Sequence, residues 1–186
     1  MSTAQLVVQH LPYLRRYARA LTGSQMAGDA YVAGREAAAV EMLDEATRWA
    51  DGPVRRADIA RVRGRILVLH GEAHAAYRLL VDAAEAVRAT DPEAAAALLA
   101  EACLDCLAGA DVPAAVAVGE EAVRVADGAG PAVGAFAACV LATSLALSGE
   151  AGRATALIDE AAPVLLQADP LTEAGAMLAQ TAQCCV

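Results

Sequence analysis

Four prolines recur at a fixed interval, and they constrain the fold more than any other feature of this chain. Pro53, Pro92, Pro131 and Pro170 stand 39 residues apart, and each opens an apolar stretch of helical length. Proline is well tolerated at the first position of a helix, because its missing N–H group would lack a partner there in any case. The residues before the prolines can cap a helix: Gly52, Asp91, Gly130 and Asp169. This regularity predicts stacked helical units.

A second pattern predicts the partner helix of each unit. Apolar residues recur at i, i+3, i+4 and i+7, which is the spacing of one helix face. The first positions of this face are Ala39, Ala76, Ala115 and Ala154, and the last are Ala46, Ala83, Ala122 and Ala161. Gly119 is the one position of the face that departs from the apolar pattern. The turn before each face is predicted to place a glycine in the left-handed conformation, namely Gly34, Gly71, Gly109 and Gly149.

Composition fits this arrangement and excludes several functions. Hydrophobic residues make up 58% of the chain but aromatic residues only 3%, so alanine and small aliphatic side chains must form a closely packed core. All basic residues are arginines, and without lysine the chain has neither a Walker-type phosphate loop nor a Schiff-base lysine. The net charge is −9, with a positive balance only in residues 1–32. We therefore predict no direct DNA binding, because that affinity comes largely from neutralising phosphates.

One uncharged segment raises the question of a membrane span. Residues 131–148 carry no charge and are long enough to cross a bilayer. Because they occupy the same place in the repeat as the charged segments 53–70 and 92–108, we interpret them as a buried central helix. The N-terminus resembles no secretory signal, and the five cysteines suggest no disulfide framework. A cytoplasmic protein is the resulting expectation.

The residues that could support redox chemistry or metal binding are better explained by structural roles. Cys103 and Cys106 form a CxxC, but they lie deep within a predicted helix, where cysteine replaces the small apolar residues of other repeats. His70 and His74 flank a turn glycine and do not form the HExxH pattern of zinc proteases. We predict no enzyme activity, no cofactor and no metal site.

Arginines supply the candidate binding residues. The predicted helix 54–70 carries five of them, and two interpretations stay open: a site for an acidic peptide or anionic ligand, and pairing with acids of the preceding helix 35–50. In a helical-repeat protein the first helix of each pair lines the concave side. The candidates on that side are Arg56, Arg63, Glu101 and Asp105, and a further set near the N-terminus comprises Arg15, Arg16 and Arg19.

The N-terminal part also resembles a known family. Residues 11–33 read LPYLRRYARALTGSQMAGDAYVA and resemble the start of the sigma-factor-like domain of general-stress response regulators. In that family this stretch is two helices that help bind an anti-sigma partner. The resemblance implies a protein partner for these residues and ends near residue 33.

A second resemblance covers about residues 35–175. The glycine, alanine and proline spacing is similar to the tetratricopeptide repeat, stretched from 34 to 39 residues. Residues 63–102 resemble the superhelical region of large ATP-dependent LuxR-type transcription regulators. In that family the region lies between an NTPase module and a helix-turn-helix. This sequence shows neither, so ATPase activity and DNA binding are not implied.

These observations predict an all-α, TPR-like right-handed superhelix of antiparallel helix pairs with a period of about 39 residues. We expect an N-terminal helical segment over 1–33 and a repeat domain over 34–186. The predicted function is a non-catalytic binding or scaffold module from a transcription-regulatory protein, with a protein or peptide partner. Two alternatives stay open: a structural protein that forms homodimers through its C-terminal helix, and a constructed or generated sequence without an evolved partner.

Overall fold

A computed structural model describes residues 36–167, and this part of the chain is built from seven α-helices without any strand. The all-α prediction is confirmed. The helices are α3 (Glu36–Trp49), α4 (Gly52–Leu69), α5 (Ala73–Val87), α6 (Pro92–Ala108), α7 (Val112–Ala126), α8 (Pro131–Leu147) and α9 (Ala151–Gln167).

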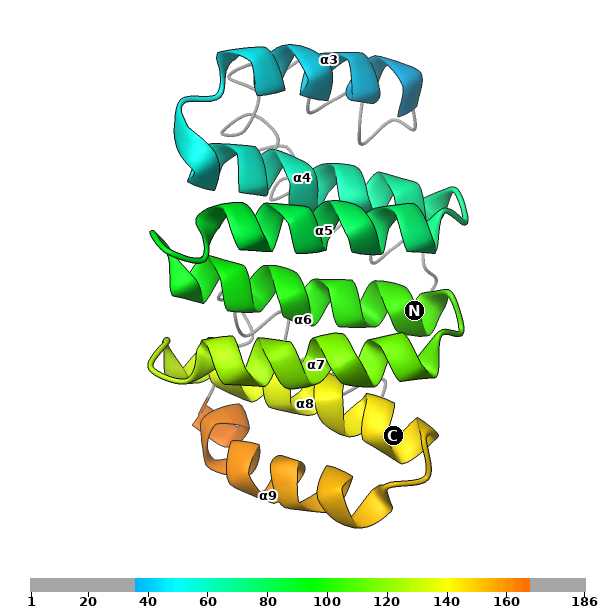
Figure 1. Ribbon diagram of the computed structural model, residues 1–186, viewed down its shortest axis with the longest axis vertical. Coiled ribbons are helices and arrows are strands. Elements are labelled where there is room, and N and C mark those ends of the chain that lie inside the picture. Colours follow the sequence, from blue (N-terminus) through cyan, green and yellow to red (C-terminus); the bar gives the residue numbers. More distant parts are fainter. Residues whose placement is uncertain (1–35, 168–186) are drawn as a thin grey trace.

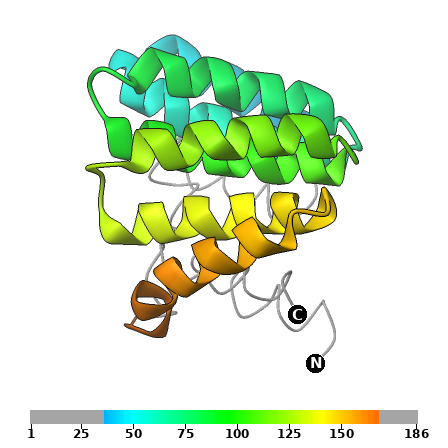
Figure 2. The same ribbon diagram turned by 60° about the horizontal axis from the view of Figure 1, so that its bottom comes forward.

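The helices stack in chain order from α3 to α9, with their axes running across the stack (Figure 1). Consecutive helices contact each other, and α6 also packs against α4 and α8. At the end of the stack α9 lies across α8, as the tilted view shows (Figure 2). The stack thus places α6 at its centre, in contact with four other helices.

Proline and aspartate define several helix starts. Pro92 and Pro131 are the first residues of α6 and α8, and Asp91 caps α6 by accepting a hydrogen bond from the Ala94 N–H at 2.9 Å. The predicted cap at Asp91 is therefore confirmed. In α4 the cap position is Asp51 and not Gly52, and the Asp51 side chain makes no capping hydrogen bond. Asp169 and Pro170 lie outside the described residues.

The turns within helix pairs share one geometry, and here one prediction is wrong. The Glu72 N–H donates to the Leu67 carbonyl at 2.8 Å, and equivalent bonds join Asp111 to Cys106 at 2.9 Å and Glu150 to Leu145 at 2.8 Å. Gly71 and Gly149 adopt positive φ as expected. In the middle turn, however, Gly109 has a φ of −82°, and the left-handed residue is Ala110, with a φ of 59°. In all three turns the residue just before the N–H donor adopts positive φ, and in the middle turn this residue is Ala110.

The core is made largely of small side chains that allow the helices to approach closely. Its central cluster runs from Ala57 of α4 to Ala161 of α9 and includes Leu98, which is 1% exposed. The predicted face is buried at Ala76, Ala115, Ala122 and Ala154. Gly119 departs from the pattern for a steric reason, because a Cβ there would lie 3.2 Å from Leu141 Cδ1 and 3.3 Å from Cys103 Sγ.

The uncharged segment 131–148 corresponds to α8, whose buried residues include Phe136, Val140 and Leu145. It contacts α6, α7 and α9. Of the helices in residues 36–167, none combines the length and the apolar character that crossing a membrane requires.

Candidate functional site: a charged cluster between α4 and α6

The predicted binding residues lie in different surroundings. Arg56 is exposed near the start of α4. Arg63 forms an ion pair with Asp44 of α3, which supports the predicted pairing with acids of the preceding helix. Glu101 and Asp105 lie on α6, with Glu101 buried and Asp105 partly buried. Arg15, Arg16 and Arg19 lie outside the described residues, as does the predicted C-terminal helix for homodimerisation.

Glu101 and Asp105 meet two arginines of α4 that belong to the five candidate arginines of the predicted helix 54–70, although they are not among those assigned to the concave side. The Arg61 Nε donates to Glu101 Oε1 at 2.9 Å, and the Arg65 guanidinium lies 3.6 Å from the same oxygen. The two arginines are four positions apart on α4, and the two acids are four positions apart on α6, so each pair projects from one face of its helix. We call these four residues, Arg61, Arg65, Glu101 and Asp105, the α4–α6 charged cluster.

The two carboxylates of the cluster differ in their surroundings. Burial, and then the neighbouring Glu101 carboxylate, raise the pKa of Asp105 to about 7, while Arg65 partly offsets this shift. The buried Oδ2 atom of Asp105 has no hydrogen-bond partner among the described residues. Arg61 and Glu101, whose side chains are 14% and 11% exposed, instead form a nearly buried ion pair. The cluster therefore joins α4 to α6 and holds one carboxyl group whose charge changes near neutral pH.

A spacing in the sequence could have identified the partners of these two arginines. Arg61 and Arg65 are four apart, as are Glu101 and Asp105, and the two pairs stand 40 residues apart. That separation is close to the repeat interval, so it places one pair opposite the other on successive first helices. An opposite-charge pattern at the repeat spacing is the signal.

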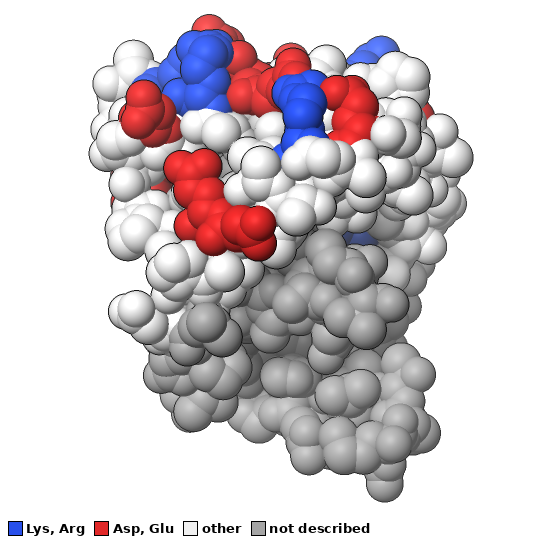
Figure 3. Space-filling model, turned by 90° about the horizontal axis from the view of Figure 1, so that it is seen from below, with Lys and Arg blue, Asp and Glu red and all other residues white. Residues whose placement is uncertain are grey.

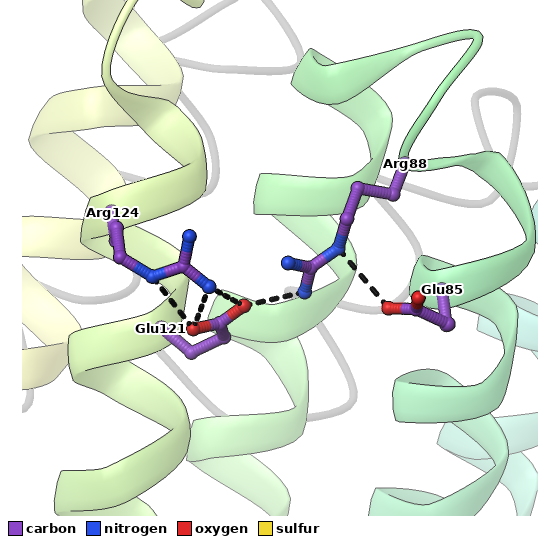
Figure 4. A network of polar contacts seen from close by, with 4 residues as sticks. All are labelled: Glu85, Arg88, Glu121 and Arg124. Atoms are coloured by element: carbon purple, nitrogen blue, oxygen red, sulfur yellow. Dashed lines mark hydrogen bonds and ion pairs between the residues drawn. The ribbon is translucent and has the colours of Figure 1, made fainter.

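A second network of charges joins the second helices of successive pairs. Arg88, which follows α5, pairs with Glu85 and reaches Glu121 of α7, which also accepts hydrogen bonds from Arg124 (Figure 4). Burial alone would raise the pKa of Glu121, but the hydrogen bonds from Arg124 and Arg88 outweigh this effect and lower it.

The charge contacts continue to the last described helix. Arg153 of α9 pairs with Glu120 of α7 and with Glu150, each at 2.8 Å. Seen from the α9 end, basic and acidic side chains lie side by side along one edge of the molecule (Figure 3). Exposed pairs of this kind contribute little stability individually.

The CxxC lies within the core. Cys103 Sγ donates to the Ala115 carbonyl at 3.1 Å and lies 3.2 Å from the Ser144 hydroxyl, so it links α6 to α7 and α8. Burial raises the pKa of Cys103 to about 11 and, together with nearby negative charge, that of Cys106 to about 12. This environment opposes the thiolate that redox chemistry needs. Within residues 36–167 no group of three or more His, Cys, Asp or Glu side chains could hold a metal ion.

His70 and His74 are both exposed at the turn between α4 and α5. The His74 ring lies 5.9 Å from that of Tyr77, measured between centroids.

Comparisons with known proteins connect the N-terminal part of the chain to a regulator. Residues 7–57 match the family model described as the Sigma2 domain of PhyR. The phyllosphere-induced regulator PhyR of Methylorubrum extorquens is 61% identical over 66 residues, or 36% of this chain. The match spans 24% of that regulator's length. No solved structure matches the chain.

The family match confirms that a segment of the chain resembles a sigma-factor-like domain, and it extends the resemblance. The sequence motif suggested an end near residue 33, whereas the match continues to residue 57, through α3 and into the start of α4. The resemblance of residues 35–175 to LuxR-type regulators stays a prediction, as does the domain boundary at 33/34.

Proposed function

We propose that this chain is a non-catalytic regulatory module that binds a protein partner through its sigma-factor-like segment. The observation that carries the proposal is the match of residues 7–57 to the Sigma2 domain of PhyR, together with the 61% identity to a regulator. The family resemblance of residues 11–33 supports an anti-sigma-type partner for this segment. The arginines Arg15, Arg16 and Arg19 are the proposed contacts within it.

The remaining helices are proposed to form a TPR-like right-handed superhelix that presents this segment. The shared hydrogen bond of the three helix-pair turns supports a repeating unit, as do the helix starts at Ala73, Val112 and Ala151. Repeat proteins of this type serve as extended binding surfaces. In this proposal Glu101 holds the repeats together through Arg61, and Arg56 remains available to a partner.

A capture experiment tests the proposal. The full chain is used as bait in a lysate of Methylorubrum extorquens, the captured protein is identified by mass spectrometry, and its affinity is then measured with both proteins purified. A matched pair of variants locates the contact. One variant changes Arg15, Arg16 and Arg19 to Glu, and the control changes Arg78, Arg124 and Arg153, three exposed arginines of α5, α7 and α9, in the same way.

We expect the first variant to lose at least about tenfold in affinity and the control to change by less than about threefold. Both variants must keep the parent's helical circular dichroism. Failure of the parent chain to bind any protein, or equal losses in the two variants, would refute the proposal.

A further inference from the structure

The turn between α3 and α4 exposes a large apolar side chain. Trp49, the last residue of α3, is 78% exposed, and Val54 in the first turn of α4 is 40% exposed. Trp49 is also the single tryptophan of the chain. Scattered exposed apolar residues are normal on protein surfaces. Tryptophan and arginine, however, are the residues most enriched at binding hot spots, and this turn carries both.

The two arginines that follow Val54 in the sequence lack the pairing of the other arginines on α4. Arg61 and Arg65 face Glu101, and Arg63 pairs with Asp44. Arg55 and Arg56 are exposed, and no carboxylate within residues 36–167 forms an ion pair with either of them. Both guanidinium groups are therefore available to a carboxylate from outside the described chain.

The position of these two arginines is unfavourable for the isolated helix. The N-terminus of a helix carries a partial positive charge, so cations there are destabilising. The first turn of α4 holds no acidic residue, and the Asp51 side chain does not cap it. A negative group docked here would therefore be attracted by the two guanidinium groups and by the partial positive charge of the helix end.

We infer that Trp49, Val54, Arg55 and Arg56, the α3–α4 corner, form the docking surface for an acidic segment of the partner protein. That segment carries two or more carboxylates beside an apolar side chain, so that the carboxylates pair with the arginines while the apolar group covers Trp49. This inference rests on the proposed function. The corner belongs to residues 7–57, the segment that matches the Sigma2 domain of PhyR.

The experiment uses the full chain and the purified partner identified by the capture assay. Because Trp49 is the only tryptophan, its fluorescence reports binding at the corner directly, provided that the partner's own emission is subtracted. The test variants are Arg55→Glu/Arg56→Glu and Trp49→Ala, and affinity is also measured calorimetrically. The matched control is Arg78→Glu/Arg124→Glu, which makes the same charge change on α5 and α7.

We expect the double arginine variant to weaken binding by about a hundredfold and Trp49→Ala by about tenfold, with a change below threefold in the control. The Trp49 emission should shift to shorter wavelength on binding. Arg55→Lys/Arg56→Lys should retain part of the affinity, and rising salt should weaken the parent more than the double variant.

The outcomes separate the inference from the proposed function. If the parent binds the partner and the corner variants bind equally well, the inference is wrong and the proposed function stands. If the parent captures no partner, both fail. A labelled 20-base-pair DNA duplex serves as a second probe. Tight binding of that duplex, lost in the double arginine variant, would overturn the assignment to an acidic protein segment.

Discussion

The α3–α4 joint and the centre around α6 pack their helices in contrasting ways. The joint is a small separate cluster of aliphatic side chains, Leu43, Ala50, Ile59 and Ile66. The centre is a continuous core in which alanines such as Ala96 and Ala100 are fully buried. Small residues let the central helices approach closely, whereas the joint depends on few contacts and one Arg63–Asp44 pair. Among the described residues, most buried side chains therefore lie in the centre, while Trp49 is exposed at the joint.

The largest expected effect comes from one substitution made in both regions. Leu98→Ala in the centre should lower the free energy of unfolding by about 3–5 kcal/mol, because α6 is surrounded and cannot collapse into the cavity. Leu43→Ala at the joint should lower the free energy of unfolding by about 2 kcal/mol. Urea unfolding gives both values, and hydrogen exchange should show that Leu43→Ala loosens α3 alone. Equal losses with global loosening in both variants would mean that the two regions form one cooperative unit.

The ion pair that joins the two regions should matter more than those on the surface. Glu101→Gln removes the carboxylate charge that the nearly buried Arg61 guanidinium pairs with on α6, and should lower the free energy of unfolding by about 2 kcal/mol. Glu120→Gln removes an exposed pair with Arg153 and should cost about 0.5 kcal/mol or less. Thermal unfolding of the two variants beside the parent measures the contrast. A Glu101→Gln loss no larger than that of Glu120→Gln would show that the α4–α6 charged cluster does not join the repeats.

Asp105 should make the same junction sensitive to pH. Its pKa rises from 3.8 to about 7 on folding, so between about pH 4 and pH 7 the folded protein holds a proton that the unfolded chain has lost. The contribution of Asp105 to stability therefore falls as pH rises through this range and stays low above pH 7. Between pH 4 and pH 8, the free energy of unfolding of Asp105→Asn should therefore rise by about 1–2 kcal/mol relative to that of the parent.

Chemical unfolding of Asp105→Asn and the parent across this pH range measures the difference. Glu101, Arg61 and Arg65 are present in both proteins, so the two proteins differ only at position 105. A difference that stays constant with pH would contradict the raised pKa.

The smallest expected effect concerns the turn between α6 and α7. Ala110 holds a left-handed conformation that glycine adopts without strain, so Ala110→Gly should stabilise the protein by about 0.5–1 kcal/mol. The reverse kind of change, Gly71→Ala, should destabilise the turn between α4 and α5 by about 1 kcal/mol. Differential scanning calorimetry resolves both shifts. A destabilising Ala110→Gly would show that the alanine side chain makes a contact worth more than the strain.

Much of this fold could be predicted from periodicity, and the exceptions have physical causes. The prolines and the alanine face located the helices because both patterns follow helix geometry. Gly109 was chosen for the turn because glycine is the usual left-handed residue, yet the hydrogen bond from Asp111 places Ala110 there. One interpretation paired the arginines of helix 54–70 with acids of helix 35–50, whereas Arg61 and Arg65 face Glu101, because pairing across helices depends on which way each face points. The sigma-like match continues to residue 57, and the composition of residues 34–57 did not indicate this extension.

The buried cysteines of the centre, such as Cys103 in contact with Ser144, provide a natural probe of how often the core opens. Cys103, Cys106 and Cys139 are buried where α6, α7 and α8 meet. A thiol reagent can reach these sulfurs only while the helices are apart, so its rate at each cysteine counts the openings of the core. Cleavage after arginine places Cys139 on the peptide 125–153 and both Cys103 and Cys106 on the peptide 89–124. Mass spectrometry of the two peptides, with fragmentation of the second, would give the rate at each cysteine without any engineered probe. The same residues that close the core thus record how often it opens.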